Sequence, residues 1–147
     1  MKVAVFSDTH TNTARMLEAV RQTMPDAIIH LGDHVRDTQC LQQEFPEIPL
    51  YSVRGNCDFT SGAPDKAVVQ LGTVKAFLTH GHLWNESRLP PIGMGTVLVH
   101  GHTHVPEQKK LACGVTIFNP GSVSLPKGGS SCGFGYFDGS ALTRYCV

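Results

Sequence analysis

The stretch KVAVFSD, residues 2–8, is a continuous apolar run that ends in polar residues. A strand that is buried on both faces has this pattern, because neither face alternates with solvent. DAIIHLGD (26–33) repeats the pattern, and PLYSVRGN (49–56) predicts a third strand. We therefore expect a buried sheet that begins with the first residues of the chain.

Two helices are predicted between these strands. The first, TARMLEAVRQTM (13–24), ends before Pro25 and places four apolar residues on one stripe: Met16, Leu17, Val20 and Met24. The second, DTQCLQQEF (37–45), points three residues inward: Cys40, Leu41 and Phe45. The resulting β-α-β-α-β order favours a parallel sheet with right-handed crossovers.

The second half of the chain is mainly strands. AVVQLGTVKAFLTHGH (67–82) predicts two strands around a Gly-Thr turn, and FGYFDGSALTRYCV (134–147) predicts a terminal hairpin through Asp-Gly. Strands are also expected in TVLVHG (96–101) and VTIFNPG (115–121). We expect one α/β domain over residues 1–147, in which the second half adds another sheet.

Composition and charge restrict the classes of function. Twelve basic residues balance twelve acidic ones, which argues against a broad electrostatic contact with nucleic acid. No apolar run is long enough for a membrane span, and the N-terminus is too short and too soon polar for a signal peptide. The five cysteines are scattered and odd in number, which predicts reduced thiols in a cytoplasmic protein.

Polar residues stand where five of the predicted strands end. They are Asp8 and His10, Gly32 and Asp33, Gly55 and Asn56, His80 and His82, and His102 and His104. In open α/β sheets, ligands bind beyond the carboxyl ends of the strands. Such a mixed oxygen and nitrogen set suits Mn, Fe, Ni or Zn. The set is larger than one ion needs, and two ions roughly 3.5–4 Å apart are a known device for cleaving phosphoesters.

Taken singly, each of these elements is typical of an ordinary turn or a core histidine; their joint order carries more weight. SDTH (7–10), LGD (31–33), RGNCD (54–58), THGH (79–82) and GHTH (101–104) resemble the five signature blocks of the calcineurin-like metallophosphoesterases. NPGS (119–122), GNCD in place of the common GNHD, and the small size resemble the YfcE-type branch of small bacterial phosphodiesterases. The resemblance spans nearly the whole chain.

The resemblance implies a two-sheet β-sandwich flanked by helices, with a dinuclear metal centre at the strand ends. The first metal would be held by Asp8, His10 and His104. The second would be held by Asn56, His80 and His102, with Asp33 bridging both. A hydroxide between the two divalent ions would attack phosphorus, so that Asp33, Asn56 and His80 take part in catalysis. Manganese is the expected metal, with nickel, iron or zinc as alternatives.

Further residues beside these ligands are candidates for supporting roles. His34, Cys57 and His82 are expected to reach substrate, although histidines in such places are more often hydrogen-bonding supports. Asp58, Asn119 and Ser122 are expected to orient ligands, with ordinary turns as the alternative. By contrast, His30 is expected in the core, Arg54 in a structural salt bridge and His100 outside the metal site.

Cys57 departs from the superfamily pattern, in which a histidine usually stands there and is thought to assist the leaving group. A thiol is a poorer general acid near neutral pH, which predicts a preference for good leaving groups. The alternative is that Cys57 only fills space and that this branch works without an acid here.

The leading hypothesis is a metal-dependent phosphodiesterase that hydrolyses small phosphodiesters. Only 18 residues separate THGH from GHTH, and with no cap domain the site should be open. The alternative is a catalytically weak or inactive scaffold that binds proteins, as does the retromer subunit of this fold, which has lost most of its ligands. Nucleases and protein phosphatases of the superfamily usually carry additional domains or loops. A homo-oligomer is possible through exposed strand edges.

Overall fold

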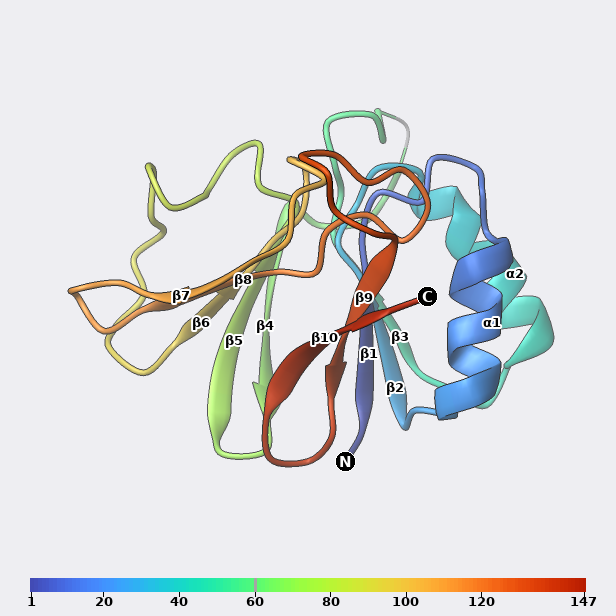
Figure 1. Cartoon of the computed structure of the whole chain (residues 1–147), viewed down its shortest axis with the longest axis horizontal. Coiled ribbons are helices and arrows are strands. Elements are labelled where there is room, and N and C mark those ends of the chain that lie inside the picture. Colours follow the sequence, from blue (N-terminus) through green and yellow to red (C-terminus); the bar gives the residue numbers. More distant parts are fainter. Residues whose placement is uncertain (60) are drawn as a thin grey trace.

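Two five-stranded sheets pack face to face, with two helices against the outer face of the first sheet (Figure 1). The computed structural model describes residues 1–59 and 61–147. The first sheet has the order β10-β9-β1-β2-β3 and contains β1 (Val3–Phe6), β2 (Ala27–His30), β3 (Leu50–Ser52), β9 (Gly133–Phe137) and β10 (Leu142–Cys146). The second has the order β4-β5-β6-β8-β7 and contains β4 (Lys66–Leu71), β5 (Val74–Thr79), β6 (Val97–Val99), β7 (Glu107–Lys110) and β8 (Thr116–Asn119). The expected two-sheet sandwich is confirmed.

Strand β1 shows why the first sheet is buried on both faces. Its residues alternate between two hydrophobic clusters, with Val3 and Val5 in the cluster between the sheets and Ala4 and Phe6 in the cluster beneath the helices. All four side chains are almost completely buried. A continuous apolar run is thus needed, because both faces of this strand are covered.

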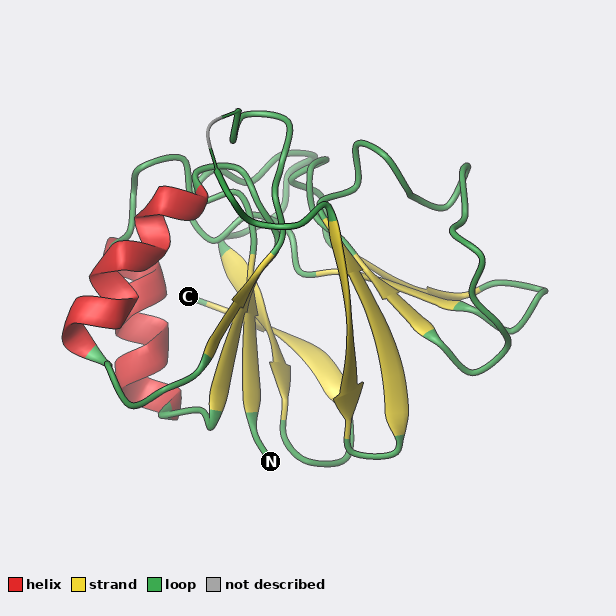
Figure 2. Ribbon diagram, turned by 180° about the vertical axis from the view of Figure 1, so that it is seen from behind, coloured by secondary structure: helices red, strands yellow, loops and turns green. Residues whose placement is uncertain are grey.

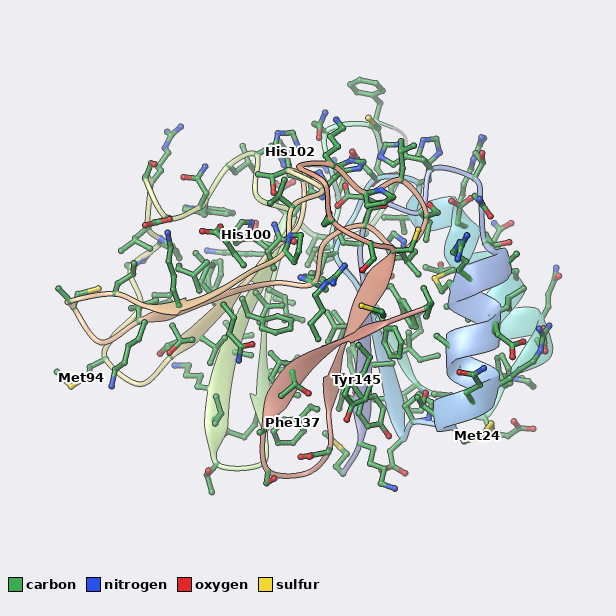
Figure 3. The ribbon with its side chains drawn as sticks, in the orientation of Figure 1. Met24, Met94, His100, His102, Phe137 and Tyr145 are labelled. Carbon is green, nitrogen blue, oxygen red and sulfur yellow. The ribbon has the colours of Figure 1, made fainter. Side chains whose placement is uncertain are left out.

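The helices are α1 (Ala14–Thr23) and α2 (Gln39–Glu44), the latter preceded by the 3₁₀ turn η1 (Val35–Thr38). In α1, Met16 and Val20 are buried as expected, but the prediction that Met24 lies on the same apolar stripe is wrong. The helix ends at Thr23, and Met24 takes a left-handed conformation with φ 42° and is 59% exposed (Figure 3). Proline at the next position disfavours the helical conformation of the residue before it, which moves Met24 off the stripe.

Pairing of the C-terminal strands differs from the expectation in two respects. The terminal hairpin joins the first sheet, because β9 pairs antiparallel with β1. Strand β7 was not anticipated, since its residues are Glu, Gln, Lys and Lys and lack an apolar alternation. It pairs antiparallel with β8 and lies at an edge of the second sheet.

Parallel pairing in both sheets brings the strand ends together. β1, β2 and β3 are parallel, as are β5, β6 and β8. The loops that follow these strands gather at one end of the sandwich (Figure 2). Among the described residues, no helix is long and apolar enough to span a membrane.

Candidate metal centre

Six side chains at this end of the sandwich form two groups with metal-binding potential. In each group, one potential ligand atom from every residue lies within 4.8 Å of the others. The first group contains Asp8, His10 and His104, and the second contains Asp33, His80 and His102. These are six of the seven ligands that the sequence motifs predict. Asp33, which was expected to bridge both ions, belongs to the second group.

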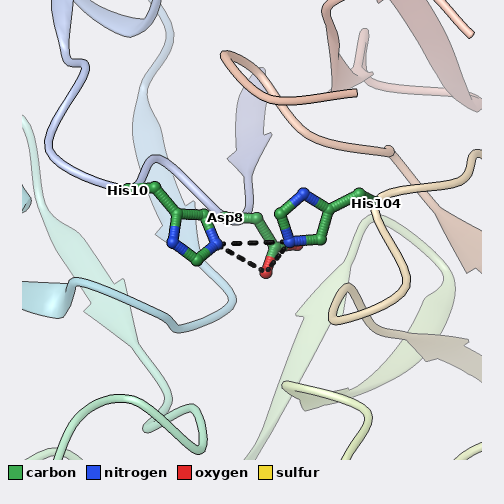
Figure 4. Close-up of side chains that lie close together, drawn as sticks. All are labelled: Asp8, His10 and His104. Carbon is green, nitrogen blue, oxygen red and sulfur yellow. Dashed lines mark hydrogen bonds and ion pairs between the residues drawn. The ribbon is translucent and has the colours of Figure 1, made fainter. Parts of the chain in front are cut away.

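Asp8 directs a carboxylate oxygen that accepts no hydrogen bond toward the rings of His10 and His104 (Figure 4). Its Oδ2 accepts hydrogen bonds from the Ser7 hydroxyl at 2.6 Å and the His102 backbone N–H at 3.1 Å. Its Oδ1 is buried without a hydrogen-bond partner and lies 3.5 Å from His104 Nε2 and 4.0 Å from His10 Nε2. Because an uncompensated buried carboxylate oxygen is costly, this arrangement fits a cation between the three side chains.

The histidines are oriented so that their lone pairs face the centre. His104 Nδ1 lies 2.6 Å from the Leu125 carbonyl and His80 Nδ1 lies 2.8 Å from the Leu31 carbonyl. Each of these nitrogens must donate its hydrogen, because a carbonyl only accepts. In a neutral ring, Nε2 of His80 and Nε2 of His104 would therefore each carry the lone pair that a metal binds. Although burial opposes it, the Asp33 hydrogen bond and the Asp8 and Asp33 charges raise the pKa of His80, so that a proton at its Nε2 takes the place that a cation would occupy.

Asp33 stands between the two groups. Its Oδ2 lies 3.4 Å from His80 Nε2 and 3.8 Å from His10 Nε2, while its Oδ1 accepts the Cys57 N–H at 3.0 Å. Burial alone would raise the pKa of Asp33, but the hydrogen bond and charge of His80 and the Cys57 N–H outweigh it and lower that pKa. Asp33 is thus held as a carboxylate that faces one nitrogen of each group.

Five of the six grouped side chains belong to residues with left-handed backbone. Their φ angles are 58° for Asp8, 46° for His10, 56° for Asp33, 74° for His102 and 62° for His104. Such angles are uncommon for residues other than glycine, and they concentrate at functional sites where the surrounding structure enforces them.

Glycine at position 101 allows the loops to approach closely enough. A Cβ atom at Gly101 would lie 1.8 Å from Ser7 Oγ and 2.8 Å from Asp8 Oδ2. The Gly101 N–H also donates to the His80 carbonyl at 2.7 Å, which ties the loop after β6 to the end of β5. The absence of a side chain at this position is therefore a condition for the Asp8 geometry.

Comparison with known proteins agrees with this geometry. A model of the calcineurin-like phosphoesterase superfamily domain matches residues 1–141. The chain belongs to this superfamily. Membership confirms the family that the motifs predict and the expected enzyme class, a phosphoric ester hydrolase.

Two curated bacterial relatives cover most of the chain. Phosphodiesterase YfcE of Escherichia coli is 33% identical over 168 residues, which span 97% of this chain and 90% of that protein. The probable metallophosphoesterase YsnB of Bacillus subtilis is 30% identical, over 86% of this chain and 78% of that protein.

Solved structures show the same fold. The structure of YfcE, a phosphoesterase from E. coli, superposes with a TM-score of 0.88 at 31% identity and covers 99% of this chain and 93% of that one. Vps29 from Entamoeba histolytica, in complex with Zn²⁺, superposes with a TM-score of 0.71 at 22% identity, over 99% and 91% of the two chains. The Vps29 likeness shows the fold alone.

The remaining predicted ligand of this phosphoesterase, Asn56, lies in the loop after β3. Its side chain is exposed, and its amide nitrogen lies 3.7 Å from Cys57 Sγ. The residues on either side of Asn56 do lie against the second group. Cys57 donates its N–H to Asp33 Oδ1, and Gly55 is so close to the same oxygen that an added Cβ would lie 2.3 Å from it. The role of Asn56 as a ligand stays a prediction.

The supporting residues mostly hold backbone. Asp58 accepts the N–H groups of Val35 at 2.8 Å and Gly55 at 2.9 Å, so it fixes two loops and no ligand side chain. Asn119 donates to the carbonyl of Gly101 at 3.3 Å and to Oγ1 of Thr103 at 3.0 Å, on both sides of His102.

Ser122 connects two parts of the first group. Its hydroxyl donates to the Asp8 carbonyl at 2.8 Å and accepts the Leu125 N–H at 2.7 Å. The Leu125 carbonyl in turn accepts the hydrogen of His104 Nδ1. Ser122 therefore positions the backbone on which both Asp8 and His104 depend.

Three histidines lie near the centre without joining either group. The His34 ring lies 5.0 Å from that of His10, and the His82 ring lies 5.5 Å from that of His80, each measured between centroids. His100 is 3% exposed and lies outside both groups, as expected. Burial lowers the pKa of His82 and of His100, so both rings are neutral at pH 7.

Sequence reasoning missed several contributors to the site. Ser7 is the first residue of the SDTH motif and has no predicted role, yet its hydroxyl donates a hydrogen bond of 2.6 Å to Asp8, shorter than that of the His102 N–H. The carbonyls of Leu31 and Leu125 carry no signal in the sequence, because any residue supplies a carbonyl. The buried His30 was expected in the core, and Arg54 does form a salt bridge, at 2.9 Å to Asp65.

Proposed function

We propose that this protein is a metal-dependent phosphodiesterase that hydrolyses small phosphodiesters with a hydroxide held between two divalent ions. The observation that carries the proposal is the buried, unpaired Oδ1 of Asp8, which lies among the ring nitrogens of His10, His80 and His104 at 3.5–4.0 Å. The phosphodiesterase activity in the name of the E. coli relative supports the diester as substrate.

We assign the ligands as the motifs predict them. Asp8, His10 and His104 would hold one ion; Asn56, His80 and His102 would hold the other; Asp33 would bind both. When bound, two such ions supply a hydroxide nucleophile near neutral pH and stabilise the charge that develops on the phosphoryl oxygens.

The chain's own residues keep this centre rigid before substrate arrives. Hydrogen bonds to the Leu31 and Leu125 carbonyls fix the rings of His80 and His104. The Cys57 N–H donates to one oxygen of Asp33, and the Ser7 hydroxyl donates to one oxygen of Asp8. The other oxygen of each carboxylate is thereby directed toward the histidine nitrogens of the centre. Preorganised groups of this kind need no rearrangement during the reaction.

Manganese is our proposed metal, and nickel, iron and zinc are the alternatives. The six grouped ligands are carboxylates and imidazoles. Burial raises the pKa of the Cys57 thiol, with the Asp33 carboxylate adding to the effect, so no thiolate is present at neutral pH. Cys57, His34 and His82 would contact the substrate. We propose a cytoplasmic location, since the five cysteines are all free thiols. We propose no nucleic-acid or membrane partner, and a homo-oligomer stays a prediction.

The test compares hydrolysis of bis(p-nitrophenyl) phosphate with that of p-nitrophenyl phosphate by metal-stripped protein, with and without added manganese. We expect metal-dependent cleavage that favours the diester and is lost in Asp33→Asn and His104→Ala. Glu47→Gln is the matched control, since this carboxylate is exposed outside the site. Faster cleavage of the monoester would make the protein a phosphomonoesterase. Inactivity of the folded protein with every metal would support the scaffold alternative.

A further inference from the structure

A pocket of about 550 Å³ adjoins the candidate metal centre on the side of Asp33 and Asn56. His34 and Cys57 contribute to its wall, and each directly follows one of these two predicted ligands. From there the pocket extends between the η1–α2 segment and the loop after β3. A substrate phosphate at the metal centre would therefore place one of its ester groups at the entrance.

Phe59 supplies the aromatic surface of this pocket. It is 88% exposed and lines the pocket. Its ring stacks on none of the described aromatic side chains. A planar ligand group in the pocket could cover it.

Helix α2 contributes uncharged polar groups to the same pocket. Gln39 and Gln42 line the pocket and are three residues apart in α2, which places them on the same face of that helix. Each carboxamide provides both a donor and an acceptor. Both side chains are exposed and available to a ligand.

The charge of the pocket is compatible with an anionic ester. Arg36 lines it and forms no ion pair with any described residue. The one carboxylate in the wall, Asp58, is 8% exposed and already accepts two backbone N–H groups with its two oxygens. Among the described lining residues, the pocket thus combines one carboxylate covered by backbone donors with one guanidinium outside any ion pair.

We propose that this pocket binds the nucleobase of a nucleoside phosphodiester, with Phe59 stacking on the base and Gln39 and Gln42 bonding its edge. The inference rests on the proposed phosphodiesterase function and names its substrate class. A base combines a flat apolar face with donors and acceptors on its rim, which matches a pocket lined by one aromatic ring and two carboxamides. A pocket of about 550 Å³ has the size of a small-molecule site.

The kinetic test uses two diesters with the same leaving group, thymidine 5′-(p-nitrophenyl phosphate) and methyl p-nitrophenyl phosphate, on the manganese-loaded full chain. We expect kcat/KM to favour the nucleoside ester by about 5- to 100-fold, the range that stacking of one base supplies. Phe59→Ala and Gln42→Ala should each lower this ratio, the first to about threefold or less. A ratio near one in the unchanged protein, or one unaffected by Phe59→Ala, overturns the inference.

The chain offers two matched controls for these variants. Gln43→Ala removes the neighbouring exposed carboxamide of the same helix, which does not line the pocket. Met94→Ala removes another exposed apolar side chain, 83% exposed and distant from His102 in Figure 3. Both control variants should keep the kcat/KM ratio of the unchanged protein. If the ratio fell equally in the controls and in Phe59→Ala, a general loss of stability would explain the effect and the role of Phe59 would be overturned.

A binding measurement separates this inference from the proposed function. Isothermal calorimetry would compare thymidine 5′-monophosphate with deoxyribose 5-phosphate on the same manganese-loaded protein. Tighter binding of the nucleotide that disappears in Phe59→Ala supports the base pocket even if neither diester is cleaved, in which case only the proposed function fails. Equal affinities for the two phosphates overturn the pocket even if both diesters are cleaved.

Discussion

Asp8 Oδ1 lies 3.5 Å from His104 Nε2, and that buried oxygen has no hydrogen-bond partner. A metal ion between them would compensate the carboxylate, so metal binding should stabilise the folded protein. Occupancy at 100 times Kd corresponds to about 2.7 kcal/mol, or roughly 5–10 °C in Tm for a chain of this size. Thermal unfolding with manganese and with a chelator measures this shift.

The Asp8→Asn variant distinguishes the stability that metal binding adds from the stability of the metal-free protein. The variant should lose most of the manganese-dependent rise in Tm, whereas its metal-free form should unfold at a similar or higher temperature, because a buried charge is removed. Glu47→Gln, at an exposed position, is the control. A chelator-insensitive Tm in the unchanged protein would contradict the metal assignment.

Gly101→Ala should disrupt the centre without touching a ligand. The added Cβ would lie 1.8 Å from Ser7 Oγ and 2.8 Å from Asp8 Oδ2, so the loop carrying Asp8 must move. We expect at least a tenfold loss of metal affinity by calorimetry, since support of the ligands commonly contributes about 10- to 100-fold. Gly93→Ala is the control, because a Cβ there meets nothing within 4 Å. Equal metal affinity in both variants would show that the centre does not depend on the close approach at Gly101.

The sequence predicts the ligands better than their supports. The motifs identify all six grouped side chains, since carboxylates and imidazoles at strand ends have a recognisable order. Ser7 and the carbonyls of Leu31 and Leu125 escape notice, because their role depends on loops that meet only in the folded chain. Asn56 stays a predicted ligand, and its amide is exposed in the loop after β3.

Pairing between distant strands was equally hard to predict. The Asp-Gly turn predicts the terminal hairpin that contains β9, but nothing local states that β9 pairs with β1 and so joins the first sheet. The charged strand β7 exists because its backbone pairs with β8, while three of its four side chains are exposed to solvent. Local pattern thus predicts elements, whereas long-range hydrogen bonds decide sheet membership.

Ser122→Ala should weaken the first group more than the second. The hydroxyl is buried, donates to the Asp8 carbonyl and accepts the N–H groups of Ser124 and Leu125, so its loss removes the acceptor of two N–H groups and the shorter of two hydrogen bonds to that carbonyl. We expect a loss of about 1–3 kcal/mol in the free energy of unfolding. Calorimetric titration with manganese should show one weakened site and one nearly unchanged site. Ser87→Ala, at an exposed position, should change neither quantity, and equal weakening of both sites would refute this role.

His30 should make the metal-free protein sensitive to acid. Its Nδ1 accepts the Gly32 N–H at 3.1 Å, which leaves Nε2 to donate to Thr9 Oγ1 at 3.2 Å in a fully buried setting. Burial lowers the pKa of His30 from 6.5 to about 4. Between these values the unfolded chain binds a proton that the folded chain does not, so stability falls as the pH falls.

The measurement is chemical unfolding of chelated protein at several pH values from 7 to 4. A single proton contributes a slope of up to about 1.4 kcal/mol per pH unit. His30→Gln cannot titrate, so it should be less stable at pH 7 but should lose that part of the slope. Identical slopes in the two proteins would show that another group causes the acid sensitivity.

Cys57→His should improve cleavage of diesters with poor leaving groups. Partial desolvation of this largely exposed thiol, together with the Asp33 carboxylate, raises the pKa of Cys57, which makes it a still weaker proton donor at neutral pH. An imidazole at the same place could protonate a departing alkoxide. The dependence of kcat/KM on leaving-group pKa should therefore be steep in the unchanged protein and shallower in the variant. Cys113→His, at another exposed cysteine, is the control. Parallel plots for all three proteins would mean that Cys57 only fills space and that the reaction proceeds without an acid at this position.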